Sequence, residues 1–145
     1  MPTVPRKDPY KNFRFLVEID GLTPVGFSEV ILPDAFLEVI EYREGADAST
    51  STRKLPGRVA YHPLILKKGL TAERELYDWW IATIEGNVHR RNLSIALLDD
   101  ARNVVKRWNV FSAWPARYQV SSLNAEGNDV CVETLELAHE GIRLE

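Results

Sequence analysis

The chain has 145 residues, with 45% hydrophobic and 27% charged side chains and a formal net charge of −3. This length suits one domain, residues 1–145, that can bury a core without a disulfide or metal, and the mild acidity argues against a dedicated nucleic-acid binder. The lone cysteine, Cys131, cannot form an internal disulfide. The N-terminus lacks the apolar core of a signal peptide, and no run has the length of a membrane span. We therefore expect synthesis and folding in the cytoplasm.

The first third of the chain predicts an extended arm followed by two strands. Residues 1–11 contain three prolines and no periodicity, which indicates an extended N-terminal arm. Apart from Leu16, apolar and polar residues alternate over Asn12–Ile19, as in a half-buried strand. Asp20-Gly21 marks a turn. A second, less regular strand is predicted over Pro24–Leu32.

A strand, a long polar loop and another strand come next. The two predicted strands are Phe36–Gly45 and Gly57–Leu66. Pro63 within the second strand indicates an edge or a bulge. The connection, Ala46–Pro56, is long for a compact domain and carries charges of both signs. We interpret residues 43–58 as a projecting loop that rests on another surface, so that assembly is the predicted function.

One helix is predicted after Lys68-Gly69. Thr71 is the expected N-cap, and Leu76, Tyr77, Trp80, Ile81 and Ile84 recur at helical spacing. Gly86 or Asn87 supplies the stop. Of the adjacent tryptophans, one is expected in the core, and an exposed Trp79 would be a candidate interface anchor.

The last third predicts strands only. Asn92–Leu98 and Val104–Phe111 form a hairpin around Asp99–Asn103, and Tyr118–Ser121 pairs briefly after Trp114-Pro115. In Val130–Ala138 the apolar phase slips by one residue, which predicts a bulge or a strand covered on both sides. The expected fold is mainly β (α+β): two packed antiparallel sheets, as a β-sandwich or partly open barrel, with one flanking helix.

No group of residues predicts chemistry. His62, His89 and His139 have no partners at metal-ligand spacing, and nothing near Cys131 in sequence would activate its thiol. Phosphate-binding, dinucleotide-binding, zinc-protease and nucleophile-elbow motifs are lacking from the sequence. We expect no catalytic, cofactor-binding or metal residues, and no enzyme.

Several sequence pieces together carry a family resemblance. They are DPYKNFRFLVEIDG (residues 8–21), GFSEV (26–30), EYREG (41–45), KLPGR (54–58), LKKGLT, the DWW of the helix, AWP (113–115) and the closing ETLELAHEGIRLE. In this order, over about Asp8–Glu145, the chain resembles the tail tube proteins of contractile phages and phage-tail-like contractile injection systems, with a fold like the type VI secretion tube protein. In the turn Asp99–Asn103, Ala101 and Arg102 stand where family members often have a glycine, which leaves the turn type open.

The resemblance implies a structural tube subunit. Hexameric rings stack into an inner tube inside a contractile sheath, strands of six subunits line the lumen, and an arm reaches the adjacent ring. Implied partners are copies of the chain itself, the sheath protein, baseplate hub, spike and tube-capping proteins, and lumen cargo, in a particle assembled in the cytoplasm and released. The arm carries over onto Glu41–Arg58. The predicted contact residues are Asp8, Pro9 and Tyr10 at the N-terminus and Arg43, Glu44, Gly45, Asp47, Arg53, Lys54, Leu55, Pro56, Gly57 and Arg58 in the arm.

Two alternatives stay open at this point. The same fold could form only the tube-initiating ring on the baseplate hub. In a different class, the chain could be a monomeric small-ligand-binding β-barrel with residues 46–56 as a lid.

Overall fold

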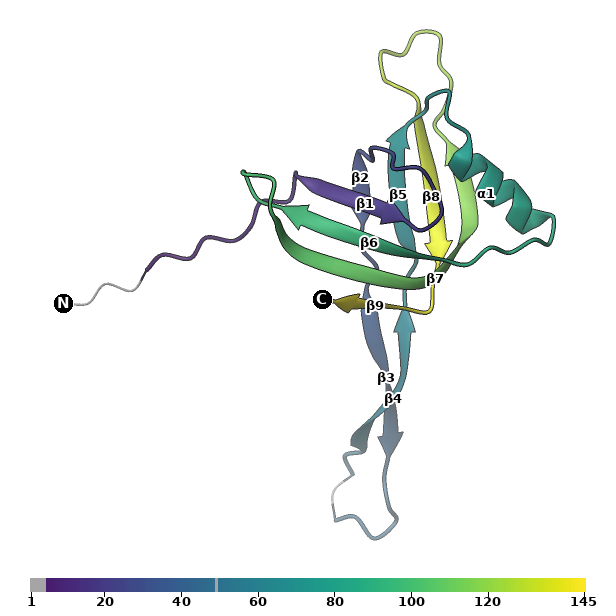
Figure 1. The fold of residues 1–145 in the computed structure, drawn as a ribbon. Helices are drawn as coiled ribbons and strands as arrows, with labels where there is room; N and C mark the ends of the chain where they lie inside the picture. Colours follow the sequence, from purple (N-terminus) through teal and green to yellow (C-terminus); the bar gives the residue numbers. More distant parts are fainter. Residues whose placement is uncertain (1–4, 49) are drawn as a thin grey trace.

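The computed structural model describes residues 5–48 and 50–145, and it confirms a mainly β fold with one flanking helix (Figure 1). In chain order the elements are β1 (Phe15–Ile19), β2 (Glu29–Ile31), β3 (Ala35–Tyr42), β4 (Arg53–Tyr61), β5 (Leu64–Gly69), α1 (Glu75–Ile84), β6 (Arg91–Leu98), β7 (Val104–Val120), β8 (Val132–Ala138) and β9 (Gly141–Leu144). Residues 1–4 of the predicted N-terminal arm lie outside the described residues, and residues 5–11 form no helix or strand.

A single long strand, β7, joins two layers of sheet. Its first half pairs with β6 and β9, and its second half pairs with β8. The direction changes around Ser112, whose φ is 52°, and the register shifts between Pro115 and Arg117. A seven-stranded sheet, with the order β1-β6-β7-β8-β5-β2 and β9 paired to β7 outside this order, therefore turns a corner at β7. Its two halves run in different directions in Figure 1.

This continuity corrects one prediction. We expected Trp114-Pro115 to separate two strands, Val104–Phe111 and Tyr118–Ser121. Instead Pro115 is buried and lies opposite Leu137 within the ladder. A proline is tolerated here because it adjoins a register shift, where the ladder is already interrupted.

The core lies between the two halves and under the helix. Every one of the strands β1, β5, β6, β7 and β8 contributes apolar side chains to it, and α1 adds Leu76 and Trp79. Trp79 donates an indole hydrogen bond to His89 O (2.8 Å), so it is the core tryptophan and the suggested interface anchor is wrong. No helix among residues 5–48 and 50–145 is long and apolar enough to cross a membrane.

Local signals mislead at several boundaries. The helix begins at Glu75 after Arg74, and Thr71 accepts a hydrogen bond from the Glu73 N–H instead of capping it. The predicted strand Pro24–Leu32 shrinks to β2, because the preceding segment is held to α1 by Glu75, which accepts hydrogen bonds from the Thr23 N–H and hydroxyl. The strand β9 has no counterpart in the predictions.

The C-terminal phase slip has a different origin from the one expected. Val130 precedes β8 and is exposed, so the slip marks the end of a loop and not a bulge in the strand. Within β8, Leu135 and Leu137 are buried on one face and the alternation is regular. The hairpin turn Asp99–Asn103 is confirmed, and Arg102 adopts φ 65°, a left-handed conformation that glycine adopts more readily.

A buried ion pair joins two neighbouring strands in the second half of the sheet. Lys68 on β5 and Glu133 on β8 are cross-strand neighbours, 3% and 2% exposed, with Nζ and Oε1 3.2 Å apart. Tyr118 on β7 donates its hydroxyl hydrogen bond to Glu133 Oε2, whereas Oε1 accepts no well-aligned hydrogen bond. Burial and the bond to Glu133 raise the pKa of Tyr118 above its ordinary value.

We predict that Lys68→Met lowers the free energy of unfolding by about 3–5 kcal/mol, because it leaves the Glu133 carboxylate buried without its cation. The double variant Lys68→Met/Glu133→Leu should recover most of this loss, since apolar replacement of a buried pair is often neutral. Urea unfolding followed by tryptophan fluorescence measures both. The control Arg74→Ala breaks an exposed pair with Asp78 and should cost less than about 1 kcal/mol. An equally small loss for Lys68→Met would contradict the prediction.

Candidate assembly interface

The β3–β4 hairpin stands apart from the rest of the fold. It forms its own two-stranded sheet and extends away from the seven-stranded sheet in Figure 1. All of β3 is exposed, and β4 is exposed or half-buried along its length. An isolated two-stranded hairpin is marginally stable in water at best. The hairpin therefore lacks the packing partner that a stable ribbon needs.

Both faces of this hairpin carry apolar side chains. Along β3, Leu37 and Val39 point to one face and Ile40 points to the other, where it pairs with Leu55; Val59 pairs with Leu37 across the register shift. Leu37, Ile40, Leu55 and Val59 are about half exposed, and Val39 is 62% exposed. Contiguous apolar surface of this kind marks an interaction site on a soluble protein.

Gly57 keeps the two strands close on the face that carries Ile40. A Cβ at this position would meet Glu38 O at 2.8 Å and Ile40 Cγ1 at 3.1 Å. The register shifts beside it, between Leu37 and Val39. This bulge also accommodates Pro56, which lies opposite Val39 on a strand whose other edge is free.

The tip of the hairpin is held by one carboxylate. Asp47 forms an ion pair with Arg53 (2.8 Å) and accepts a hydrogen bond from the Glu44 N–H (2.9 Å). Arg43 donates to the Asp47 carbonyl, and Tyr42 donates to Glu44. The loop, residues 43–52, is therefore an internally bonded turn, of which Ser49 lies outside the described residues.

The structure divides the predicted contact residues of the arm between two places. Arg43, Glu44, Gly45 and Asp47 lie in the tip loop, and Arg53, Lys54, Leu55, Pro56, Gly57 and Arg58 belong to β4. We predicted loop structure up to Pro56 and one strand over Gly57–Leu66. Instead β4 starts at Arg53, paired with Tyr42, and ends before His62 and Pro63 separate it from β5.

The N-terminal residues lie elsewhere. Asp8, Pro9 and Tyr10 line an open hollow against the turn between β6 and β7, beside Asp100. Lys11 pairs with the Asp100 carboxylate (3.7 Å), and Arg14 donates to the Asp100 carbonyl (3.1 Å). The two sets of residues project from different sides of the fold in Figure 1.

The strands also leave backbone edges unpaired within residues 5–48 and 50–145. In the seven-stranded sheet, β1 pairs only with β6, and β2 only with β5. Residues 114–120 of β7 pair only with β8. Exposed edges of this kind are templates for pairing with another chain.

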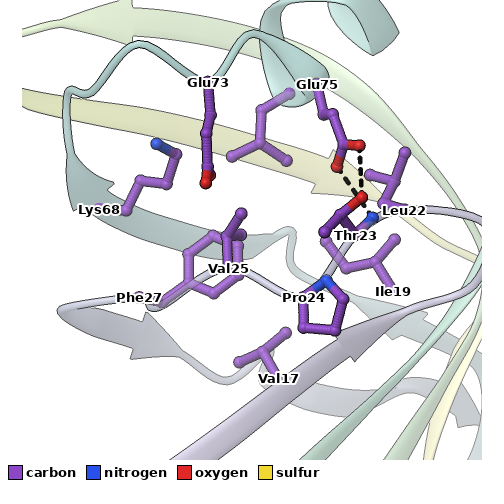
Figure 2. Close-up of a pocket in the computed structure, with 11 residues that line it drawn as sticks. Val17, Ile19, Leu22, Thr23, Pro24, Val25, Phe27, Lys68, Glu73 and Glu75 are labelled. Carbon is purple, nitrogen blue, oxygen red and sulfur yellow. Dashed lines mark hydrogen bonds between the residues drawn. The ribbon is translucent and has the colours of Figure 1, made fainter.

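The small-ligand alternative finds no support in the small hollow beside the start of α1. Figure 2 shows this hollow, between the segment after β1 and the start of α1, with Val17, Phe27 and Lys68 among its lining residues. Its volume is about 10 Å³, room for one water at most and far below the several hundred Å³ of a ligand pocket.

Sequence reasoning missed the apolar part of this interface. It included Leu55 and Pro56 of β4 among the contact residues but none of β3, although apolar residues were evident on both faces of Phe36–Tyr42. That pattern was the available signal, because a strand apolar on both faces needs two covers. The hairpin, as a separate two-stranded sheet, has neither of these covers within the described part of the chain.

Comparisons with known proteins agree with this architecture. The family model of the T4-like virus tail tube protein gp19 matches residues 11–143. A chain of the PVC sheath/tube terminator of an extracellular contractile injection system is 30% identical, with TM-score 0.85, 96% of this chain and 98% of that chain covered. A chain of the PVC sheath–tube complex is 27% identical (TM-score 0.85, 94% and 91% covered). A chain of the six-fold symmetrised anti-feeding prophage baseplate is 25% identical (TM-score 0.85, 97% of each covered).

More distant matches show the fold alone. Hcp1 from Flavobacterium johnsoniae is 15% identical, with TM-score 0.53 and 90% of this chain and 93% of that chain covered. A search of curated proteins gave no match.

We predict that Gly57→Ala loosens the hairpin selectively, because the added methyl group meets the backbone of β3. Opening of β3–β4 should become about 1–3 kcal/mol easier, read as faster hydrogen exchange of its amides. Exchange in β5–β8 should change little, since the hairpin is a separate sheet. The matched control is Gly45→Ala, which meets nothing within 4 Å. Unchanged exchange in the hairpin would refute the steric role of Gly57.

Proposed function

From the premise that the chain belongs to the T4-like virus tail tube protein family, we propose that it is the structural subunit of the inner tube of a contractile phage-tail-like injection particle. Six copies form a ring, and rings stack into a tube. Contraction of a surrounding sheath drives the tube through a target envelope. The relatives' solved structures, a sheath–tube complex and a six-fold symmetrised baseplate, support this architecture.

The observation that carries the proposal is the exposed β3–β4 hairpin. Its apolar side chains Leu37, Ile40, Leu55 and Val59 are exposed on both faces in the isolated chain. A second copy can cover them, because the same chain also offers free strand edges at β2 and at residues 114–120 of β7. Closing a ring of identical subunits pairs every such edge without leaving a new one.

The contacts follow from the placement of the hairpin. We assign the shaft of β3–β4 to contacts that complete the ring, and the tip loop, residues 43–52, to the adjacent ring. Asp8, Pro9 and Tyr10 are assigned to a separate subunit contact beside the turn between β6 and β7. In this scheme residues 1–145 act as one tube-like domain with an N-terminal arm.

The proposed role is mechanical, and the chain makes or breaks no bond. Its partners are copies of itself along the tube, a sheath protein around it, and hub, spike and capping proteins at its ends. The particle assembles in the cytoplasm and is released. The sheath and terminator assemblies in which the relatives were solved support these partners.

A second candidate is a ring confined to one end of the tube. Chains from a baseplate structure and from a sheath/tube terminator structure match with the same TM-score of 0.85 as one from the sheath–tube complex. The end-ring role uses the same ring contacts but requires no stacking of identical rings.

We predict that purified full-length protein forms rings with six-fold symmetry in negative-stain electron microscopy, and that rings stack into tubes as concentration rises. Isolated rings at every concentration would favour the end-ring candidate. Small featureless particles at high concentration, with a monomer mass by light scattering, would overturn both.

We also predict that replacing the tip loop, residues 43–52, by Asn-Gly preserves rings but shortens or abolishes tubes. The two-residue turn keeps Tyr42 opposite Arg53, and the loop contributes little to the core. Tube length by electron microscopy is the measurement, with Arg74→Ala on the helix as the control. Tubes as long as those of the unaltered protein would remove the loop from the stacking contact.

A further inference from the structure

The second half of the sheet has a polar outer face that the core does not use. Along β2, β5, β8 and residues 114–120 of β7, alternate side chains point away from the core. These outward residues line an open hollow whose charged members are Glu29, Lys67, Arg117 and Glu136. We call this surface the concave face, because it lines a hollow in the sheet.

The strand register arranges the concave face in rows. One row across the four strands reads Glu29, Lys67, Thr134 and Gln119, and the next reads Ile31, Ile65, Glu136 and Arg117. Each row therefore holds one acidic and one basic side chain on neighbouring strands. A third row, beside Gly69, carries Val132 and Ser121 and no charge.

The charges of each row lie opposite one another as ion pairs. Lys67 Nζ lies 3.9 Å from Glu29 Oε1, and Arg117 Nη1 lies 3.7 Å from Glu136 Oε1. The first pair bridges β2 and β5, and the second bridges β7 and β8, so positive and negative charges alternate across the face. At physiological salt, compensation within a few ångströms leaves little net field beyond the surface.

The concave face would lie inside a closed assembly. Edges of β2 and of residues 114–120 of β7 bound this half of the sheet and are free, so pairing between copies extends it around a circle. When a curved sheet closes, its concave side faces the interior. Its other side is filled by the core residues Leu64, Leu66, Leu135 and Leu137.

We propose that Glu29, Lys67, Arg117 and Glu136 make the bore of the tube charge-balanced, so that it retains neither polyanions nor polycations and passes polypeptides of either net charge. This inference rests on the proposed function. It assigns a specificity role to four residues. In each ion pair, one side chain cancels the attraction that its partner alone would exert on a charged polymer.

The test uses assembled full-length protein and two fluorescent probes, a short single-stranded DNA and an oligolysine peptide, with binding followed by anisotropy at low and high salt. Unaltered assemblies should bind neither probe appreciably. Glu29→Gln/Glu136→Gln should bind the DNA about tenfold more tightly or better, with a steep loss in salt. Lys67→Gln/Arg117→Gln should do the same for oligolysine.

The matched control is Glu85→Gln/Glu126→Gln, which removes the same charge from exposed positions outside the concave face. It should change DNA binding less than twofold. Electron microscopy of the same samples separates a failure of the charge-balanced bore from a failure of the proposed tube function. Intact rings whose binding is unchanged by the paired variants, or unaltered assemblies that bind DNA tightly, would overturn the charge-balanced bore. Absence of rings in the unaltered protein would overturn the proposed function, and the bore with it.

Discussion

The organisation of this fold depends on backbone groups and apolar side chains that find no partner within the described part of the chain. A strand edge presents a row of N–H and C=O groups, and leaving such groups unpaired and buried costs as much as lost hydrogen bonds. The hairpin β3–β4 adds a ribbon whose exposed apolar side chains have no layer packed against them. The self-association proposed above would give the free edges a strand to pair with and the hairpin a surface to pack against.

The rest of the fold serves to present those edges rigidly. The long strand β7 belongs to both halves of the sheet, so the halves cannot move independently without breaking its ladders. Lys68, Glu133 and Tyr118 add a buried polar link across β5, β8 and β7. Because a buried charge is costly without its partner, such a link penalises any slip of register between these strands. A rigid corner suits the mechanical tube role proposed above.

Charge is distributed differently on the tip of the β3–β4 hairpin and on the concave face. The tip of the hairpin gathers Arg43, Glu44, Asp47 and Arg53 into a compact, internally bonded loop. The concave face instead spreads two ion pairs over four strands. The tip loop suits a shape-specific contact, since the bonds within it fix its conformation before a partner binds. The concave face suits a surface to which charged chains do not adhere, since neither charged row leaves a charge without an opposite neighbour.

Much of the fold could be predicted from local pattern. Alternation over Phe15–Ile19, the helical stripe around Leu76 and the turn Asp99–Asn103 identified a strand, the helix and a hairpin. The polar connection after Tyr42 identified a projection, although Arg53–Pro56 proved to be strand. Prediction failed where a neighbour distant in sequence decides the outcome. Pro115 reads as a break but is buried opposite Leu137, and Thr71 reads as a cap four residues before the helix begins.

The sequence by itself determined which residues alternate, where the helix lies, and that the chain resembles tail tube proteins, because these depend on residue type and spacing along the chain. Only the tertiary structure decided that β3 and β4 leave the main sheet as a separate ribbon, that β7 runs unbroken through the corner, and that acidic and basic residues form neutral rows. The physical reason is that alternation assigns a side chain to a face, whereas strand pairing, which is non-local, decides what that face meets.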